Sequence, residues 1–148
     1  MYEELIKDLL SLFYIKKPPI KPEIIAYGLG VEVHFQELPS QISGILYNHN
    51  DHPMILINKR DNPLRQRFTI AHELGHFLLH HSNKQIYFDY PISKNPKLEK
   101  EANTFAASLL LPDFFLKRYL NLPYQKISSI FQVSQKVIEI RLKDFKTI

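Results

Sequence analysis

The stretch from Phe68 to His81 reads FTIAHELGHFLLHH, and it contains the pattern H-E-x-x-H. Residues four apart lie on the same face of a helix, so the imidazoles of His72 and His76 can occupy two neighbouring corners of a zinc tetrahedron. Glu73 lies about 100° around the helix from His72, where its carboxylate can reach a water molecule on the metal. This stretch therefore predicts a helix that carries the centre of a metal-dependent hydrolase.

The surroundings of the motif favour a buried site over a helix with two solvent-facing histidines. Leu74 precedes the second histidine, and further apolar residues follow it at positions 77–79. A helix this apolar is expected to press at least one of its histidines against protein. Gly75 costs about 1 kcal/mol relative to alanine inside a helix, which is consistent with another backbone lying close to it. A later helical pattern with small residues at Ala102 and Ala106 suits that partner.

That later pattern, from about Lys97 to Leu111, also offers the third protein ligand that a catalytic zinc site usually needs. Glu99 shares a helix face with Asn103 and with the small residue Ala106. Glu101 lies about 200° around the helix from Glu99, so Glu99 is the predicted ligand and Glu101 the alternative. Asn103 can hydrogen-bond the ring nitrogen of a ligating histidine that faces away from the metal. The competing interpretation of the two glutamates is a solvated helix start, where acids favour the positive end of the helix dipole.

The composition limits the classes of protein to consider. A chain of 148 residues with 45% hydrophobic and 23% charged residues predicts one globular domain, made of residues 1–63 (N-terminal helices and sheet), 64–112 (metal-site helices) and 113–148 (C-terminal helices). The absence of cysteine excludes disulfides and cysteine-based zinc sites. No apolar run has the length of a membrane span or signal peptide, so we expect a cytoplasmic protein with no membrane partner. The net charge of +4 is spread along the chain and does not by itself indicate DNA binding.

Three segments have the character of strands. Residues 31–35 alternate with a period of two, and residues 43–47 and 54–58 flank turn formers, so the last two should form an antiparallel hairpin. Three potential ligands lie between these two segments, His49, Asp51 and His52. They are better explained as residues of a polar turn than as a metal site. Helices are expected at residues 2–15, 22–28, 64–79, 97–111, 113–120, 124–131 and 134–143. The predicted fold is α+β, with a three-stranded antiparallel sheet packed on a helical core.

The C-terminal segment has the apolar rhythm of a helix-turn-helix between Tyr124 and Lys143. However, Gln132 stands where a turn glycine is expected, and Ser128 stands where a small alanine is common. Two short helices that pack on the core would have the same pattern. A structural or substrate-docking role is therefore favoured over DNA contact.

Residues 65–80, together with the pattern from Glu99 to Pro112, resemble the ImmA/IrrE family of bacterial and phage metallopeptidases. The resemblance covers most of the chain, including Ser43-Gly44 and Arg141-Leu142. It implies a small zincin-like domain in which Glu73 is the general base and Zn²⁺ is bound by three residues, His72, His76 and Glu99. It also implies a protein substrate, such as a helix-turn-helix repressor of a prophage or mobile element.

Two hypotheses follow for the function. The first is a zinc-dependent endopeptidase, in which the metal polarises the scissile carbonyl and Glu73 moves the proton of the attacking water. Its oxyanion donor besides zinc is open among His80, Tyr47 and Tyr124, and His80 alternatively forms a hydrogen bond near the site. The second is a metal-binding regulatory module that binds a repressor or DNA and hydrolyses little. Metal ligation and a poised glutamate serve both hypotheses.

Overall fold

The computed structural model describes residues 2–80, 86–88 and 95–146. Its helices are α1 (Glu3–Leu12), α2 (Pro22–Gly28), α3 (Pro63–His80), α4 (Pro96–Leu110), α5 (Asp113–Leu116), the 3-10 helix η2 (Lys117–Tyr119), α6 (Tyr124–Phe131) and α7 (Gln135–Lys146). Its strands are β1 (Glu32–Gln36), β2 (Gly44–His49), β3 (His52–Asn58) and β4 (Ile86–Phe88). The fold is α+β, as expected. In these described ranges, no helix is both long enough and apolar enough to cross a membrane.

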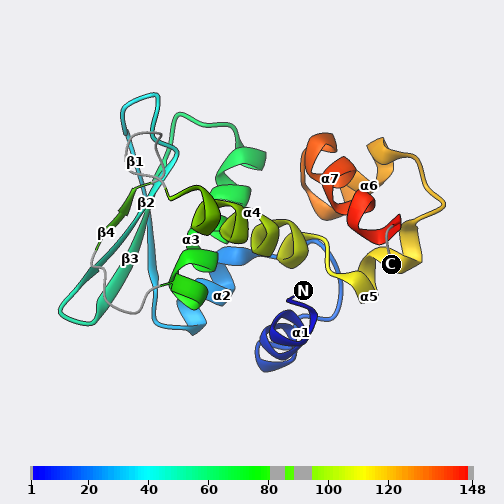
Figure 1. Ribbon diagram of the computed structural model, residues 1–148, viewed down its shortest axis with the longest axis horizontal. Coiled ribbons are helices and arrows are strands. Elements are labelled where there is room, and N and C mark those ends of the chain that lie inside the picture. Colours follow the sequence, from blue (N-terminus) through cyan, green and yellow to red (C-terminus); the bar gives the residue numbers. More distant parts are fainter. Residues whose placement is uncertain (1, 81–85, 89–94, 147–148) are drawn as a thin grey trace.

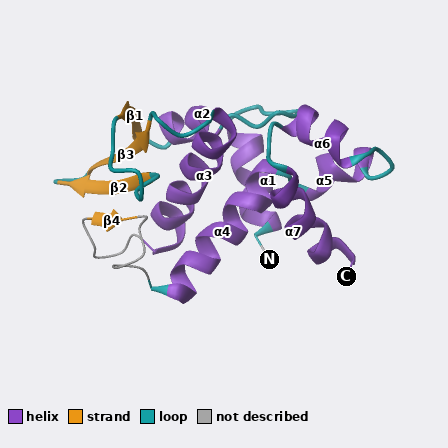
Figure 2. Ribbon diagram, turned by 90° about the horizontal axis from the view of Figure 1, so that it is seen from above, coloured by secondary structure: helices purple, strands orange, loops and turns teal. Residues whose placement is uncertain are grey.

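Helix α3 lies between the sheet on one side and the α6–α7 pair on the other (Figure 1, Figure 2). Its start is fixed by Asn62, whose Oδ1 accepts a hydrogen bond from the backbone N–H of Arg65 at 3.0 Å. Pro63 occupies the first turn, where its missing N–H costs nothing. Asn62 is therefore the N-terminal cap of α3. The helix is buried on all sides from Thr69 to His76, and this buried segment contains the H-E-x-x-H motif.

The sheet has four strands in the order β1-β3-β2-β4, and it is mixed. Strands β2 and β3 form the expected antiparallel hairpin, with Asn50 and Asp51 at its tip. Both tip residues have positive φ, 50° and 63°, as a two-residue type I′ turn requires. However, β1 pairs in parallel with β3, and β4 pairs antiparallel with β2. The expectation of a three-stranded antiparallel sheet is therefore wrong in both the number of strands and the direction of β1.

The parallel pairing of β1 follows from the route of residues 37–43. This connection passes the end of β3 and leads from the end of β1 into β2, which lies on the other side of β3. Strand β2 therefore runs opposite to β1, and because β3 is antiparallel to β2, β1 and β3 run in the same direction. Asn58, buried at the end of β3, holds the connection in place. Its side-chain Nδ2 donates hydrogen bonds of 2.9 to 3.2 Å to three carbonyl oxygens, those of Leu38, Pro39 and Ile42. The strand direction thus depends on a long-range contact that strand periodicity does not reveal.

Helices α3 and α4 cross closely because small residues meet at their contact. A Cβ on Gly75 would lie 3.2 Å from the Cα of Ala102 and 3.1 Å from Cδ1 of Phe105. Such distances are tighter than ordinary packing, so the crossing depends on the missing side chain. The expected contact between Gly75 and the small residues of the later helix is confirmed. It places the start of α4, with Glu99, beside the histidines of α3.

The α6–α7 pair is joined to the rest of the chain by two arginines. Arg67 of α3 donates hydrogen bonds to three backbone carbonyls, those of Ile20, Phe131 and Gln132. Arg141 of α7 is buried, donates from Nε to the Leu111 carbonyl at 3.0 Å, and forms an ion pair with Asp113. These contacts fix both ends of the pair, one against α3 and the other against the junction of α4 and α5.

The turn between α6 and α7 lies at Gln132, which adopts the left-handed conformation with φ 55° and ψ 57°. The hydroxyl of Ser128 donates a hydrogen bond of 2.6 Å to the Val133 carbonyl across the same turn. A glycine would adopt this conformation without steric cost, which is why the sequence pattern calls for one there. The bounds of α6 agree with expectation, whereas α7 begins one residue later and ends three residues later than expected. The helix-turn-helix character of the segment stays a prediction.

Candidate metal centre

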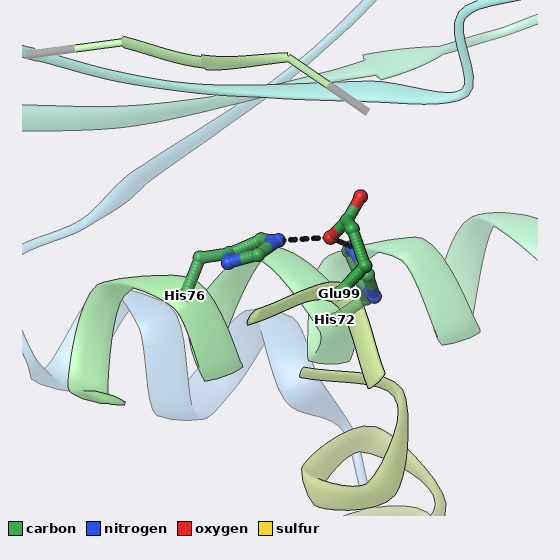
Figure 3. A group of neighbouring side chains, drawn as sticks. All are labelled: His72, His76 and Glu99. Carbon is green, nitrogen blue, oxygen red and sulfur yellow. Dashed lines mark hydrogen bonds and ion pairs between the residues drawn. The ribbon is translucent and has the colours of Figure 1, made fainter. Parts of the chain in front are cut away.

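Three side chains converge at the crossing of α3 and α4. His72 and His76 from α3 and Glu99 from α4 point toward one another (Figure 3). One glutamate oxygen, Oε2, lies 2.5 Å from Nε2 of His76 and 3.1 Å from Nε2 of His72. The donor atoms all lie within 4.8 Å of one another, and the residues are largely buried. Two imidazole nitrogens and a carboxylate oxygen form a donor set that suits zinc.

Asn103 orients the first of these histidines. The Nδ1–H of His72 donates to Oδ1 of Asn103 at 2.7 Å, so the lone pair of the neutral ring lies on Nε2, which faces Glu99. The sequence predicts this contact from the position of Asn103, one helical turn after Glu99. A partner that fixes the tautomer of a ligating histidine is typical of metal sites.

A second chain of hydrogen bonds orients His76. Glu101 lies 3.1 Å from Nε2 of His80, and because a carboxylate only accepts, this nitrogen carries the proton. In the neutral ring, Nδ1 of His80 then accepts from Nδ1–H of His76 at 3.1 Å, which leaves the Nε2 lone pair of His76 toward Glu99. The spacing of four residues is the sequence signal for the contact between His76 and His80. The contact between His80 and Glu101 depends instead on how α3 and α4 cross.

The charge states of the site also suit a metal. Burial lowers the pKa of His76, and it outweighs the hydrogen bond that the charged ring donates from Nε2–H to Glu99, which favours protonation. Burial alone would raise the pKa of Glu99, but hydrogen bonds and charge from His72 and His76 hold it well below its usual value. A neutral imidazole and an ionised carboxylate are the forms that bind metal ions. Near neutral pH the centre is therefore ready to accept a cation.

Glu73 is fully buried on α3, next to His72, and its stem lies against the start of β2. A Cβ on Gly44 would come within 2.5 Å of Thr69 Cγ2 and 3.5 Å of Glu73 Cγ. The absence of a side chain at Gly44 therefore lets β2 approach this face of α3. That approach limits the positions that the Glu73 side chain can adopt.

The positions of the other predicted metal ligands and oxyanion donors distinguish them from the donor group. The potential ligands of the polar turn lie at the tip of the β2–β3 hairpin, and the three-residue donor group does not include them. His80 has both ring nitrogens in contact with His76 and Glu101, so it is poorly suited to bind an oxyanion. Tyr124 is the first residue of α6, whereas Tyr47 lies on β2, the strand whose start contacts Glu73. Tyr47 lies three residues after Gly44, so strand alternation turns its side chain to the sheet face opposite the one that Gly44 presents to α3.

Comparison with known proteins identifies the family to which this site belongs. Residues 26–143 match the model of the IrrE N-terminal-like domain, a peptidase family. The chain belongs to this family. Immunity region protein 2 of Bacillus phage phi105 is 32% identical over 118 residues, which make up 79% of this chain and 75% of the relative. Metallopeptidase ImmA of Bacillus subtilis is 34% identical over 110 residues, 69% of this chain and 63% of ImmA.

A third relative is much longer than this chain. Radiation response metalloprotease IrrE of Deinococcus radiodurans is 29% identical over 113 residues, 73% of this chain but 34% of IrrE. Among solved structures, a Mycobacterium tuberculosis transcriptional regulator superposes with a TM-score of 0.69 at 16% identity, over 95% of this chain and 45% of that one, which supports the fold alone. The resemblance to the ImmA/IrrE family is confirmed. This chain is accordingly a metallopeptidase of a zinc-dependent family.

Proposed function

We propose that this protein is a zinc-dependent endopeptidase that cleaves a protein regulator, such as a helix-turn-helix repressor of a prophage or mobile element. The observation that carries the proposal is the group of two histidine nitrogens and one carboxylate oxygen within 4.8 Å of one another, next to a buried glutamate. The names of ImmA and IrrE support the reaction. The immunity-region name of the phage relative supports a regulator of such an element as the substrate.

In this proposal His72, His76 and Glu99 hold the zinc, and hydrogen bonds keep the two rings in the tautomer that binds it. Asn103 holds the ring of His72, while His80 and Glu101 together hold the ring of His76. Bound zinc supplies a Lewis acid that activates water and polarises a carbonyl oxygen. The protein contributes the fixed position of the ligands and a water-poor environment around them.

Glu73 is the proposed general base. Its carboxylate accepts a proton from the attacking water as the water oxygen forms a bond to the carbonyl carbon of the peptide. When the carbon–nitrogen bond breaks, the same group returns that proton to the leaving amine. The closeness of β2 at Gly44 to the stem of Glu73 supports this role because it limits the positions that the carboxylate can adopt.

We further propose that residues 1–63, 64–112 and 113–148 act as one unit in the cytoplasm, with no DNA partner. The hydrogen bonds of Arg67 and Arg141, which cross between these segments, support the single unit. A chain without cysteine is compatible with a reducing compartment. The dispersed lysines and arginines support a protein substrate over nucleic acid.

The test of the proposed function is Glu73→Gln, which removes the base and keeps the size of the side chain. Co-expressed with a candidate full-length repressor, this variant should bind zinc as the wild type does and cleave about 10² to 10⁴ times more slowly. Glu4→Gln, an exposed change of the same kind on α1, is the matched control and should cleave normally. Zinc content and an immunoblot of the repressor give the two readouts. If Glu73→Gln inactivates the repressor as fast as wild type, the non-hydrolytic regulatory module is the correct function.

A further inference from the structure

A groove of about 860 Å³ extends from the metal centre between α3, α4 and α7. His72, Glu99 and Asn103 belong to its lining, together with residues from the first half of α3 and from the start of α7. Because the donor group is part of the wall, a peptide lying in the groove would pass directly over the metal site. The groove is therefore positioned to hold the substrate on one side of the bond that is cut.

Apolar side chains that are exposed or half-buried lie on two walls of this groove. Leu64 and Phe68 come from α3, and Val137 and Ile140 come from α7. The exposed fractions of Leu64 and Ile140 are 37% and 51%, which is high for apolar residues on facing helices. Exposed apolar side chains grouped in a concave surface indicate a site for apolar groups of a ligand.

The charges in the groove are predominantly positive. Lys100 of α4 and Lys136 of α7 are exposed in its lining, and no ion pair with either is found in the described part of the chain. Arg65 also lines the groove, but Asp61 lies 3.6 Å from its Nε, which offsets its charge. Of the described lining residues, Glu99 is the one carboxylate, and it is engaged with the two histidines. The groove therefore complements a negative charge placed beside apolar groups.

We infer that this groove binds an extended segment of the substrate in which an acidic side chain lies next to apolar ones. The inference rests on the proposed peptidase function, because it assigns the groove to the substrate of the same metal centre. A peptide suits the groove better than nucleic acid does, since nucleic-acid sites are polar and strongly basic whereas these walls are largely apolar. Lys100 and Lys136 are then specificity residues, one on each side of the bound chain.

Three short fluorescein-labelled peptides test the inference, with leucines separated by Glu, by Gln or by Lys. Fluorescence polarisation would measure their binding to the zinc-loaded Glu73→Gln protein, which leaves them uncut. The Glu peptide should bind about threefold to tenfold more tightly than the Gln peptide, as expected for two exposed ion pairs. In the same background, Lys100→Glu with Lys136→Glu should reverse the order and favour the Lys peptide.

The matched control is Lys59→Glu with Lys126→Glu, which makes the same change in net charge at exposed positions outside the groove. It should keep the preference for the Glu peptide. Equal binding of the three peptides, an equal loss of preference in both double variants, or tighter binding of a short single-stranded DNA would overturn the inference. Separately, if the protein with intact Glu73 binds the Glu peptide but never cuts it or a repressor, the proposed function fails while the groove assignment stands.

Discussion

The α3–α4 pair and the α6–α7 pair are both helix contacts, but they bury different chemistry. The α3–α4 contact buries His72, Glu73, His76 and Glu99 among apolar neighbours. The α6–α7 contact buries apolar side chains, among them Ile127, Phe131 and Ile138. Buried polar and charged groups cost free energy unless they are paired, whereas buried apolar groups stabilise the fold directly. One pair therefore arranges a metal centre, and the other holds the chain around it.

The contrast leads to opposite expectations for substitutions in the two pairs. Changes at the α3–α4 centre should alter zinc affinity far more than they alter the unfolding free energy of the metal-free protein. Changes inside the α6–α7 pair should alter the unfolding free energy of the metal-free protein far more than they alter zinc affinity. Zinc affinity and the unfolding free energy of the metal-free protein are therefore the two quantities that distinguish the pairs.

Glu99→Ala should have the largest effect, because it removes one of the three proposed ligands of the metal. We expect zinc affinity to fall by more than about 100-fold, beyond the range typical of residues that only orient a ligand. Competition with a chromophoric chelator measures the affinity, and circular dichroism checks that the metal-free variant is folded. If Glu101→Ala lost more zinc affinity than Glu99→Ala, Glu101 would be the ligand and the proposed site would be wrong.

Phe131→Ala should give the largest loss of stability. The ring is fully buried and packs edge-on against Tyr119 at a centroid distance of 5.5 Å, so its removal should cost about 3 to 5 kcal/mol. Urea denaturation of the metal-free protein measures this loss. Phe131→Leu, which retains more of the volume, should lose less and stay folded for the zinc titration. A fall in its zinc affinity as large as that of Glu99→Ala would show that the two regions are not separable.

Changes to the pair that orients His76 should have an intermediate effect. His80→Ala removes the acceptor of the His76 Nδ1–H, and the expected loss of zinc affinity is about 10-fold to 100-fold. Glu101→Gln keeps an oxygen that can accept from His80 Nε2–H, so it should lose much less affinity than Glu101→Leu. Chelator competition again provides the measurement. Equal losses in Gln and Leu variants would mean that the charge of Glu101, and not its hydrogen bond, matters to the metal.

These predictions use some features that the sequence reveals and some that it does not. His72, His76, Glu99 and Asn103 could be predicted because each pair lies on one helix, where spacing fixes the shared face. The contact of Gly75 with the later helix followed from the small side chains there. These relations are local or follow from side-chain size, so the sequence pattern is sufficient for them.

The features that escaped prediction depend on how separate elements meet. The parallel direction of β1 depends on a crossing connection held by Asn58, and strand periodicity is the same for either direction. Strand β4 lies outside the three segments that have the character of strands, and it exists as a partner of β2. Helix position alone offers Glu101 as an alternative ligand, and its contact with His80 depends on how α3 and α4 cross, which spacing does not fix. Long-range geometry therefore accounts for each of these differences.

Gln132→Gly should have the smallest effect, and it should increase stability. Gln132 adopts φ 55° at the turn between α6 and α7, a conformation that costs an ordinary residue roughly 1 kcal/mol and costs glycine nothing. The greater freedom of glycine in the unfolded chain offsets part of this gain, so we expect about 0.5 kcal/mol and a rise in Tm of about 1 to 2 °C. The hydrogen bond from Arg67 to the carbonyl of residue 132 involves the backbone and should persist.

Gln132→Ala is the control that separates backbone conformation from the loss of the glutamine side chain. If glycine and alanine had the same effect, the left-handed conformation would not be the source of the gain. Zinc affinity should be unchanged in both variants, because the turn belongs to the α6–α7 pair and the proposed metal ligands belong to α3 and α4. A stabilising change at Gln132 that also altered zinc affinity would mean that Arg67, which lies on α3 and donates to the turn, transmits changes from one region to the other.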